Sequence, residues 1–141
     1  MNIKDIMSTD TQLVSRDTSV AAAAESMSRA GVGFLLVGDD DQLRGTLTDR
    51  DIVLRVVANH KNPEHTTVGE ILTDQLLYCR TDQPVEEVAR NMSQQQVRRM
   101  PVLNADKRLV GVVSIGDIAQ HLTADLAGEV LQGVTAEFAA A

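Results

Sequence analysis

GTLTDRD at residues 45–51 and GVVSIGD at residues 111–117 are two versions of one sequence pattern. Each stretch has a glycine, two residues suited to a strand, a hydroxyl residue, two spacer residues and an aspartate. An apolar run precedes the hydroxyl residue and a helical pattern follows it, which predicts a strand-to-helix junction. Two such junctions in one chain indicate an internal repeat.

The repeat extends well beyond these two stretches. Sliding the sequence by 65 positions aligns identical residues without a gap, and one inserted residue near Lys107 changes the offset to 66. The identical pairs include Ile6 with Ile71, Asp17 with Asp82, Val20 with Val85, Ala24 with Ala89, Met27 with Met92, Val37 with Val102, Leu43 with Leu109, Gly45 with Gly111, Asp51 with Asp117 and Ile52 with Ile118. We therefore interpret the chain as a duplication, with copies at about residues 3–58 and 68–123.

Each copy carries the same order of predicted elements. In the first copy, apolar residues at helical spacing predict a helix that starts at Asp17, and the run FLLV (34–37) predicts a buried strand. A turn, a second strand and a helix that opens at Thr48 follow. The second copy repeats this order from Asp82 to Ser114. Strand, helix, strand, strand, helix, found twice, predicts an α/β fold of two βαββα repeats.

The expected domain boundaries follow from the duplication. Residues 1–60 form the first repeat with a lead-in segment, and residues 68–123 form the second repeat. The polar stretch 61–67, which contains a proline, reads as a surface linker. A repeat of this size buries little surface alone, so we expect the two copies to pack as one module. The alanine-rich tail at 124–141 fits a terminal helix, a dimer contact or a frayed end.

Composition excludes several classes of partner. The 141 residues carry a formal net charge of −7, which disfavours non-specific binding to nucleic acid or to an anionic membrane. Two Phe, one Tyr and no Trp leave few aromatic side chains for stacking of exposed bases. Cys79 is the single cysteine, which fits a reducing, cytoplasmic protein, and no signal peptide or membrane span is expected. We expect small molecules or proteins as partners.

The two junctions allow two compatible interpretations. Thr48 with Asp51, and Ser114 with Asp117, have the spacing of a capping box, in which the hydroxyl residue caps the helix. The same arrangement suits a ligand, because amides at a helix start attract phosphate and a carboxylate accepts both hydroxyls of a ribose.

At this level of detail the chain resembles tandem CBS domains, of the kind found as stand-alone bacterial CBS pairs (Bateman modules). The resemblance rests on the repeated junctions, on RRMPV (98–102), and on NIKDIMS (2–8) and TVGEILT (67–73), which resemble the lead-in segments of such proteins. It implies two repeats related by a pseudo-twofold axis, clefts between them, and a homodimer. It also implies an adenosine-containing ligand, namely AMP, ADP, ATP, NAD or S-adenosylmethionine, and no catalytic cofactor.

The resemblance also implies roles for particular residues. Asp51 and Asp117 match ribose-binding aspartates, and Thr48 and Ser114 match hydroxyl contacts near the ribose and phosphate. Further expected ligand-binding positions lie at the start of the middle strand of each repeat, and these are Arg98, Arg99, Met100 and Pro101 in the second copy and Gly33 and Phe34 in the first.

Only the second copy has arginines at the start of its middle strand. The resemblance implies that these arginines contact a ligand at the site formed by Thr48 and Asp51, so we expect that site to prefer phosphorylated ligands. We expect the site of Ser114 and Asp117 to bind weakly or to stay empty.

Other candidate residues point to structure rather than chemistry. His60, His65 and His121 show no ligand spacing and are expected at the surface. Residues 39–41 are three aspartates, which suits either a metal site or, as we favour, a solvated hairpin turn. Cys79 aligns with Val14 and is expected to be a small buried side chain.

The favoured function is therefore a regulatory module that senses an adenine nucleotide and signals to an unidentified partner protein. The alternative is a structural dimerisation module without a ligand. An enzyme built on the acidic cluster would need a metal and a general base, and we predict no catalytic residue and no metal site.

Overall fold

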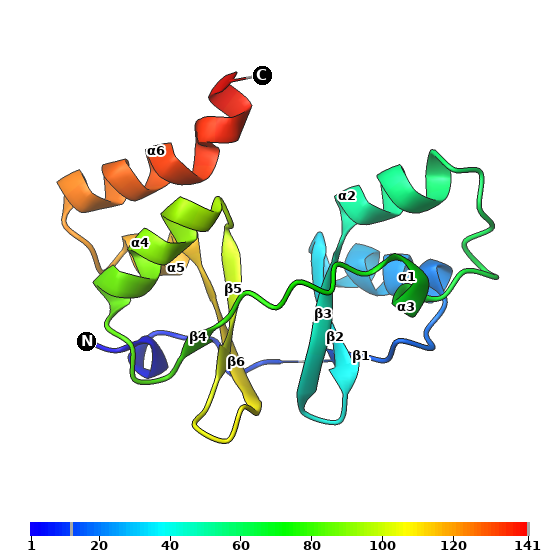
Figure 1. Ribbon diagram of the computed structural model, residues 1–141, viewed down its shortest axis with the longest axis horizontal. Coiled ribbons are helices and arrows are strands. Elements are labelled where there is room, and N and C mark those ends of the chain that lie inside the picture. The colour runs from blue at the N-terminus through cyan, green and yellow to red at the C-terminus, as the bar shows by residue number, and fades with distance from the viewer. Residues whose placement is uncertain (12, 141) are drawn as a thin grey trace. The chain divides into compact units, whose positions relative to one another are not determined.

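The computed structural model describes residues 1–11 and 13–140 and divides into two compact units (Figure 1). The first-copy unit spans residues 12–76, and the second-copy unit combines residues 1–11 with residues 77–141. Each unit has its own three-stranded sheet, in which the first strand is parallel and the last is antiparallel to the middle strand. The predicted α/β fold of two repeats is thus confirmed.

The elements follow the predicted order in both units. In the first-copy unit they are β1 (Leu13–Val14), α1 (Val20–Ala30), β2 (Phe34–Asp39), β3 (Gln42–Thr48), α2 (Asp49–Ile52), the π-helical turn η2 (Val53–Val57) and α3 (Val68–Ile71). In the second-copy unit they are the 3-10 turn η1 (Ile3–Asp5), β4 (Cys79–Arg80), α4 (Val85–Gln95), β5 (Arg99–Leu103), β6 (Leu109–Ser114), α5 (Ile115–Ala119) and α6 (Ala124–Ala140).

The first helix of each copy begins later than predicted. Asp17 and Asp82 were expected at the helix starts, but α1 begins at Val20 and α4 at Val85. The Ser19 hydroxyl caps α1 by accepting a hydrogen bond from the Ala22 amide at 3.1 Å. In the second copy Pro84 holds the capping position, where its missing N–H costs no helical bond.

The predicted apolar stripes form two separate cores. In the first-copy unit the buried core residues are Val20, Ala23, Met27, Val37, Leu47, Val56, Val68 and Ile71. In the second-copy unit they are Ile3, Cys79, Val85, Val88, Ala89, Met92, Met100, Val102, Val113, Ile118, Val130 and Val134. Apolar burial of this kind is the main term that favours folding of each unit.

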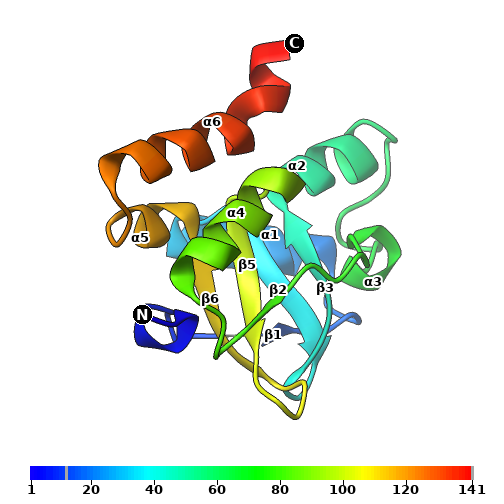
Figure 2. The same cartoon turned by 60° about the vertical axis from the view of Figure 1, so that its left-hand side comes forward.

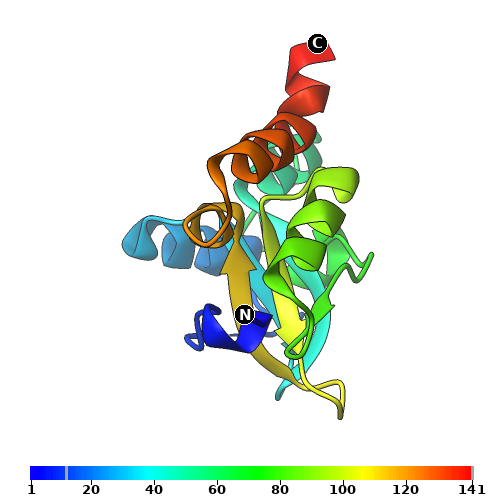
Figure 3. The ribbon, with the colours of Figure 1, turned by 90° about the vertical axis from the view of Figure 1, so that its left-hand side faces the viewer.

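Each core includes a residue from the lead-in segment of the other copy. Ile3, from the lead-in at the start of the chain, is fully buried in the second-copy core. Ser8 and Val112 exchange two backbone hydrogen bonds of 2.9 Å, which attach this lead-in to β6 (Figure 3). The lead-in precedes the first repeat in the sequence, with which it was expected to group, but its apolar residue and its hydrogen bonds belong to the second-copy unit.

The second lead-in segment attaches to the first copy in the same way. Ile71 lies in the first-copy core, and Thr46 on β3 exchanges two backbone hydrogen bonds with Thr73, of 3.0 and 2.9 Å. The lead-in backbone passes so close to the strand that a Cβ on Gly45 would meet the Thr73 carbonyl oxygen. A Cβ on Gly111 would likewise meet Met7 and the Ser8 carbonyl oxygen. The glycine that opens each repeated junction is therefore required by this crossing.

The C-terminal tail is a helix, the first of its three predicted alternatives. Helix α6 runs beside α4 (Figure 2) and buries Val130 and Val134 in the second-copy core. Of the helices described, none combines the length and apolar character needed to cross a bilayer.

We predict that Gly111→Ala lowers the free energy of unfolding by about 1 to 3 kcal/mol, because the added methyl group overpacks the lead-in crossing. Gly128→Ala in α6 is the control, since a Cβ there meets nothing within 4 Å and alanine favours a helix. Urea denaturation measures both changes. Equal stability of the Gly111→Ala variant and the parent would contradict the account of the crossing.

Candidate ligand-binding junctions

The first-copy junction is a complete capping box. Thr48 ends β3 in an extended conformation, and its Oγ1 accepts a hydrogen bond from the Asp51 amide at 3.1 Å. In return, Asp51 Oδ2 accepts a hydrogen bond from the Thr48 amide at 3.0 Å. The other carboxylate oxygen, Oδ1, lies 3.7 Å from Arg55 Nη2 in an ion pair. The Asp51 side chain is only 14% exposed, so this carboxylate is held on several sides.

All three amides of the first turn of α2 are used within the protein. The Asp49 amide donates to the Gly33 carbonyl at 3.0 Å. The Arg50 amide donates to Asp49 Oδ1 at 2.8 Å, and the Asp51 amide donates to Thr48 as described. The helix start that sequence reasoning assigned to an anion therefore offers no open amide among its first three.

The second-copy junction is open. Ser114 Oγ accepts a hydrogen bond from the Asp117 amide at 3.1 Å, and the Ile115 amide donates to the Arg98 carbonyl at 2.8 Å. The reciprocal bond of a capping box, from the Ser114 amide to the Asp117 carboxylate, is not formed. Within the described part of the chain, the Asp117 carboxylate and the Gly116 amide make no hydrogen bond or ion pair, and both residues are exposed. A ligand can reach both groups without displacing a protein contact.

Each middle strand begins beside the junction of its own unit. The antiparallel register pairs Phe34 with Thr48 and Arg99 with Ser114. Arg98 and Arg99 are exposed and make further contacts, whereas Met100 is buried in the second-copy core and Pro101 is buried as well.

Gly33 has a steric role at the first-copy junction, because a Cβ at this position would lie 2.6 Å from the Asp49 carboxylate. The lack of a side chain at Gly33 is what allows Asp49 to cap the Arg50 amide.

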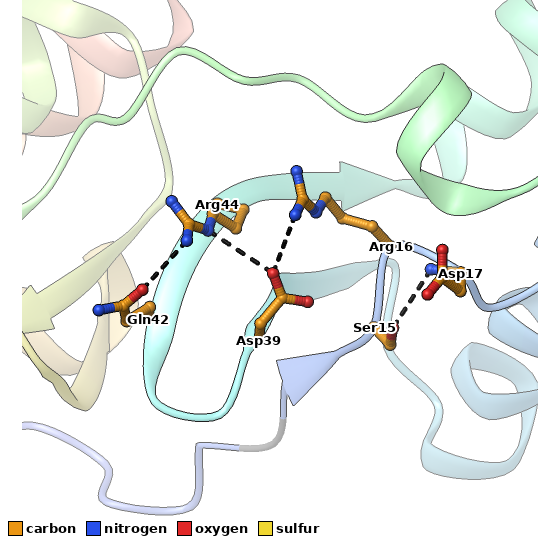
Figure 4. A network of polar contacts seen from close by, with 6 residues as sticks. All are labelled: Ser15, Arg16, Asp17, Asp39, Gln42 and Arg44. Atoms are coloured by element: carbon orange, nitrogen blue, oxygen red, sulfur yellow. Dashed lines mark hydrogen bonds and ion pairs between the residues drawn. The ribbon is translucent and has the colours of Figure 1, made fainter.

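The aspartate-rich turn of the first copy is engaged in ion pairs. Asp39 lies 3.0 Å from Arg16 Nη2 and 3.6 Å from Arg44 Nε, which ties the loop after β1 to the β2–β3 hairpin (Figure 4). Among the residues that the structure describes, no group of three or more His, Cys, Asp and Glu side chains is placed to hold a metal ion. The three histidines, His60, His65 and His121, are exposed as predicted.

Cys79 is buried as predicted. It is 2% exposed, and its Sγ donates to the Pro101 carbonyl at 3.6 Å. Burial raises the pKa of the thiol to about 12, so at neutral pH it carries no thiolate and is a poor nucleophile.

Sequence reasoning missed Arg55, which contacts both Asp51 and the Ile71 carbonyl. The signal was present, because an acid and a base four residues apart on a helix lie on the same face.

A three-stranded sheet with helices, built twice and closed each time by a hydroxyl-capped strand-to-helix turn, defines a tandem α/β repeat module. The sequence model of the CBS domain matches residues 3–58 and 68–124. The chain belongs to the CBS domain family and contains two CBS domains in tandem.

Relatives of similar length support this assignment. Hypoxic response protein 1 of Mycobacterium tuberculosis is 40% identical over 120 residues, which are 84% of this chain and 83% of that protein. A crystal structure of Hypoxic Response Protein I with two coordinated zinc ions matches at a TM-score of 0.78 and 39% identity, over 86% of this chain and 99% of that one. CBSX2 in complex with AMP matches at a TM-score of 0.73 and 27% identity, over 85% of this chain and 94% of that one.

We predict that Asp51→Ala lowers the free energy of unfolding by about 0.5 to 2 kcal/mol, because the Thr48 amide loses its partner in a partly buried place. Asp117→Ala is the matched change at the second junction and should cost less than about 0.5 kcal/mol, as for an exposed side chain without contacts. Urea denaturation at neutral pH compares the two. Equal losses would contradict the difference between a closed and an open junction.

Proposed function

We propose that the chain is a regulatory module that binds an adenine nucleotide at its strand-to-helix junctions and signals to a partner protein. The observation that carries this proposal is the pairing, in both units, of a capping hydroxyl with an aspartate three residues later. Such a pair presents a hydroxyl donor and a carboxylate acceptor a short distance apart. The two groups complement the phosphate and the ribose hydroxyls of a nucleotide.

The capping bonds leave these groups able to bind. The oxygen of each hydroxyl, in Thr48 and in Ser114, accepts a hydrogen bond from the aspartate amide through a lone pair. The hydroxyl hydrogen therefore remains available to donate to a phosphate oxygen. With a net charge of −7, the chain has to attract an anion through local groups. Arg99, exposed at the start of β5 and paired in register with Ser114, supplies positive charge near the second-copy junction.

The two junctions are proposed to differ in affinity. The second-copy junction has an exposed Asp117 carboxylate and an exposed Gly116 amide, so a ligand there displaces no protein contact. At the first-copy junction a ligand competes with Arg55 and with the Thr48 amide for Asp51. We therefore propose tighter binding at Ser114 and Asp117, which reverses the order expected from the positions of the arginines alone.

The AMP complex of the similar protein CBSX2 supports an adenine nucleotide as the ligand. Several such ligands, namely AMP, ADP, ATP, NAD and S-adenosylmethionine, share a ribose whose hydroxyls the junction aspartates can accept. We propose binding without catalysis, which agrees with Cys79 being buried and held as a thiol. The unpaired Cys79 also fits the proposed cytoplasmic location.

A second candidate function is a structural dimerisation module without a ligand. It is favoured by one observation, the exposure of Val53, Leu54 and Val57 on η2, since neighbouring exposed apolar side chains mark an association surface.

We predict that AMP or a related adenosine compound raises the melting temperature of the purified protein, whereas GTP does not. A ligand at about 100 times its Kd stabilises by roughly 2.7 kcal/mol, which a thermal-shift screen detects. Asp117→Ala should weaken binding by about 10- to 100-fold, the effect of losing a charge-assisted hydrogen bond. If none of the five adenosine compounds shifts the transition, the structural alternative holds.

We predict that Arg99→Ala weakens AMP binding by about 10- to 100-fold and leaves adenosine binding nearly unchanged, because a guanidinium pairs with the charged phosphate, which adenosine lacks. Calorimetry with both ligands measures the two effects. Equal loss for AMP and adenosine would mean that Arg99 shapes the site instead of binding phosphate.

We predict a homodimer in solution, because dimerisation would cover the apolar side chains of η2. Sedimentation at micromolar concentration measures the mass. Val53→Ser with Val57→Ser should shift the equilibrium toward the monomer, while a parent protein that is already monomeric would contradict the prediction.

A further inference from the structure

Arg55 makes two contacts in different parts of the first-copy unit. It lies in the π-helical turn η2, one turn after Asp51, and its Nη2 is 3.7 Å from Asp51 Oδ1. Its Nη1 donates to the Ile71 carbonyl at 2.6 Å. Because the guanidinium is planar and rigid, Nη1 and Nη2 cannot move independently. A movement of the guanidinium at Asp51 therefore changes its hydrogen bond to the Ile71 carbonyl.

The Ile71 carbonyl belongs to the segment that leads out of the first-copy unit. Ile71 is the last residue of α3, and Thr73 is attached to β3 by two backbone hydrogen bonds with Thr46. Residues 74–76 are exposed, and from residue 77 the chain belongs to the second-copy unit. Arg55 thus links the Asp51 carboxylate at the junction to the Ile71 carbonyl, where the connecting segment starts.

The second copy differs from the first at the position of Arg55. The residue aligned with Arg55 is His121, which is exposed and, among the described residues, makes no ion pair with Asp117. The link between the aspartate and the lead-in segment is therefore a property of one copy and not of the repeat.

We propose that Arg55 is a positioning residue that couples occupation of Asp51 by a ribose to the order of residues 71–76. This inference rests on the proposed nucleotide binding. Ribose hydroxyls that take the Asp51 carboxylate remove the partner of Arg55 Nη2, and the guanidinium then shifts against the Ile71 carbonyl. Residue 55 thereby passes a local binding event to the segment that joins the two units, which is the kind of coupling between sites that signalling requires.

The first test needs no ligand and uses amide hydrogen exchange at Leu72 and Thr73. Asp51→Asn, which keeps a capping oxygen but loses the charge, and Arg55→Gln should each speed exchange there by about three- to tenfold. The double variant should exchange no faster than the faster single variant, because both changes break one linkage. The control is Arg44→Gln, because Arg44 and Arg55 are matched in exposure and in ion-pair length. Arg44 is 47% exposed with an ion pair of 3.6 Å, and Arg55 is 45% exposed with one of 3.7 Å. Additive effects in the double variant, or the same change in Arg44→Gln, would overturn the proposal.

The second test adds AMP, at a concentration that saturates the first-copy junction, to the parent and to Asp117→Ala, in which only that junction keeps its aspartate. In the parent, exchange at Leu72 and Thr73 should change on binding. In Arg55→Gln, calorimetry should still show AMP binding within about threefold of the parent or tighter, while the exchange response is lost. Binding of AMP by Asp117→Ala without a response at these amides would overturn the coupling and leave the proposed function intact. Failure of the parent to bind any adenosine compound would overturn the proposed function, and the ligand-free test would still decide whether Arg55 links Asp51 to the segment.

Discussion

The crossing of a lead-in segment over a glycine is the contact on which each unit depends. At Gly111 the strand β6 comes so close to Met7 and Ser8 that no side chain fits, and at Gly45 the strand β3 does the same with Thr73. The crossing brings Ile3 into one core and Ile71 into the other. Because the lead-ins supply buried apolar surface that the sheets and their own helices lack, each copy is completed by residues outside it.

Local signals in the sequence predicted the parts of the fold that depend on local physics. The duplicated order of elements and the helix starts at Thr48 and Ser114 follow from apolar periodicity and capping chemistry. The burial of Cys79 follows from its alignment with Val14 in the repeat. The placement of the lead-ins could not be predicted in this way, because apolar character indicates that Ile3 is buried but not which copy buries it. The glycine of the repeated pattern held the missing information, since its conservation between the copies marks a close backbone approach.

The residue types of the candidate site could be predicted from the sequence, but not whether each capping box is closed or open. Sequence spacing indicated a capping box at both junctions, but a box closes only when the aspartate side chain turns back toward the capping residue. Asp51 does so, and Arg55 lies on its other side. Asp117 does not, and it stays exposed. The choice between these states depends on neighbouring side chains in three dimensions, which spacing along the chain does not specify.

The spacer residues of the repeated pattern explain one part of the difference between the junctions, namely whether the second amide of the helix has a partner. Between Thr48 and Asp51 the spacers are Asp49 and Arg50, and the Asp49 carboxylate takes the Arg50 amide. Between Ser114 and Asp117 they are Ile115 and Gly116, and an isoleucine side chain has no acceptor for the Gly116 amide. The positions that the repeat leaves variable therefore decide how many groups remain for a ligand. Duplication supplied two junctions with the same frame, and divergence at the spacers and at residue 55 gave them different chemistry.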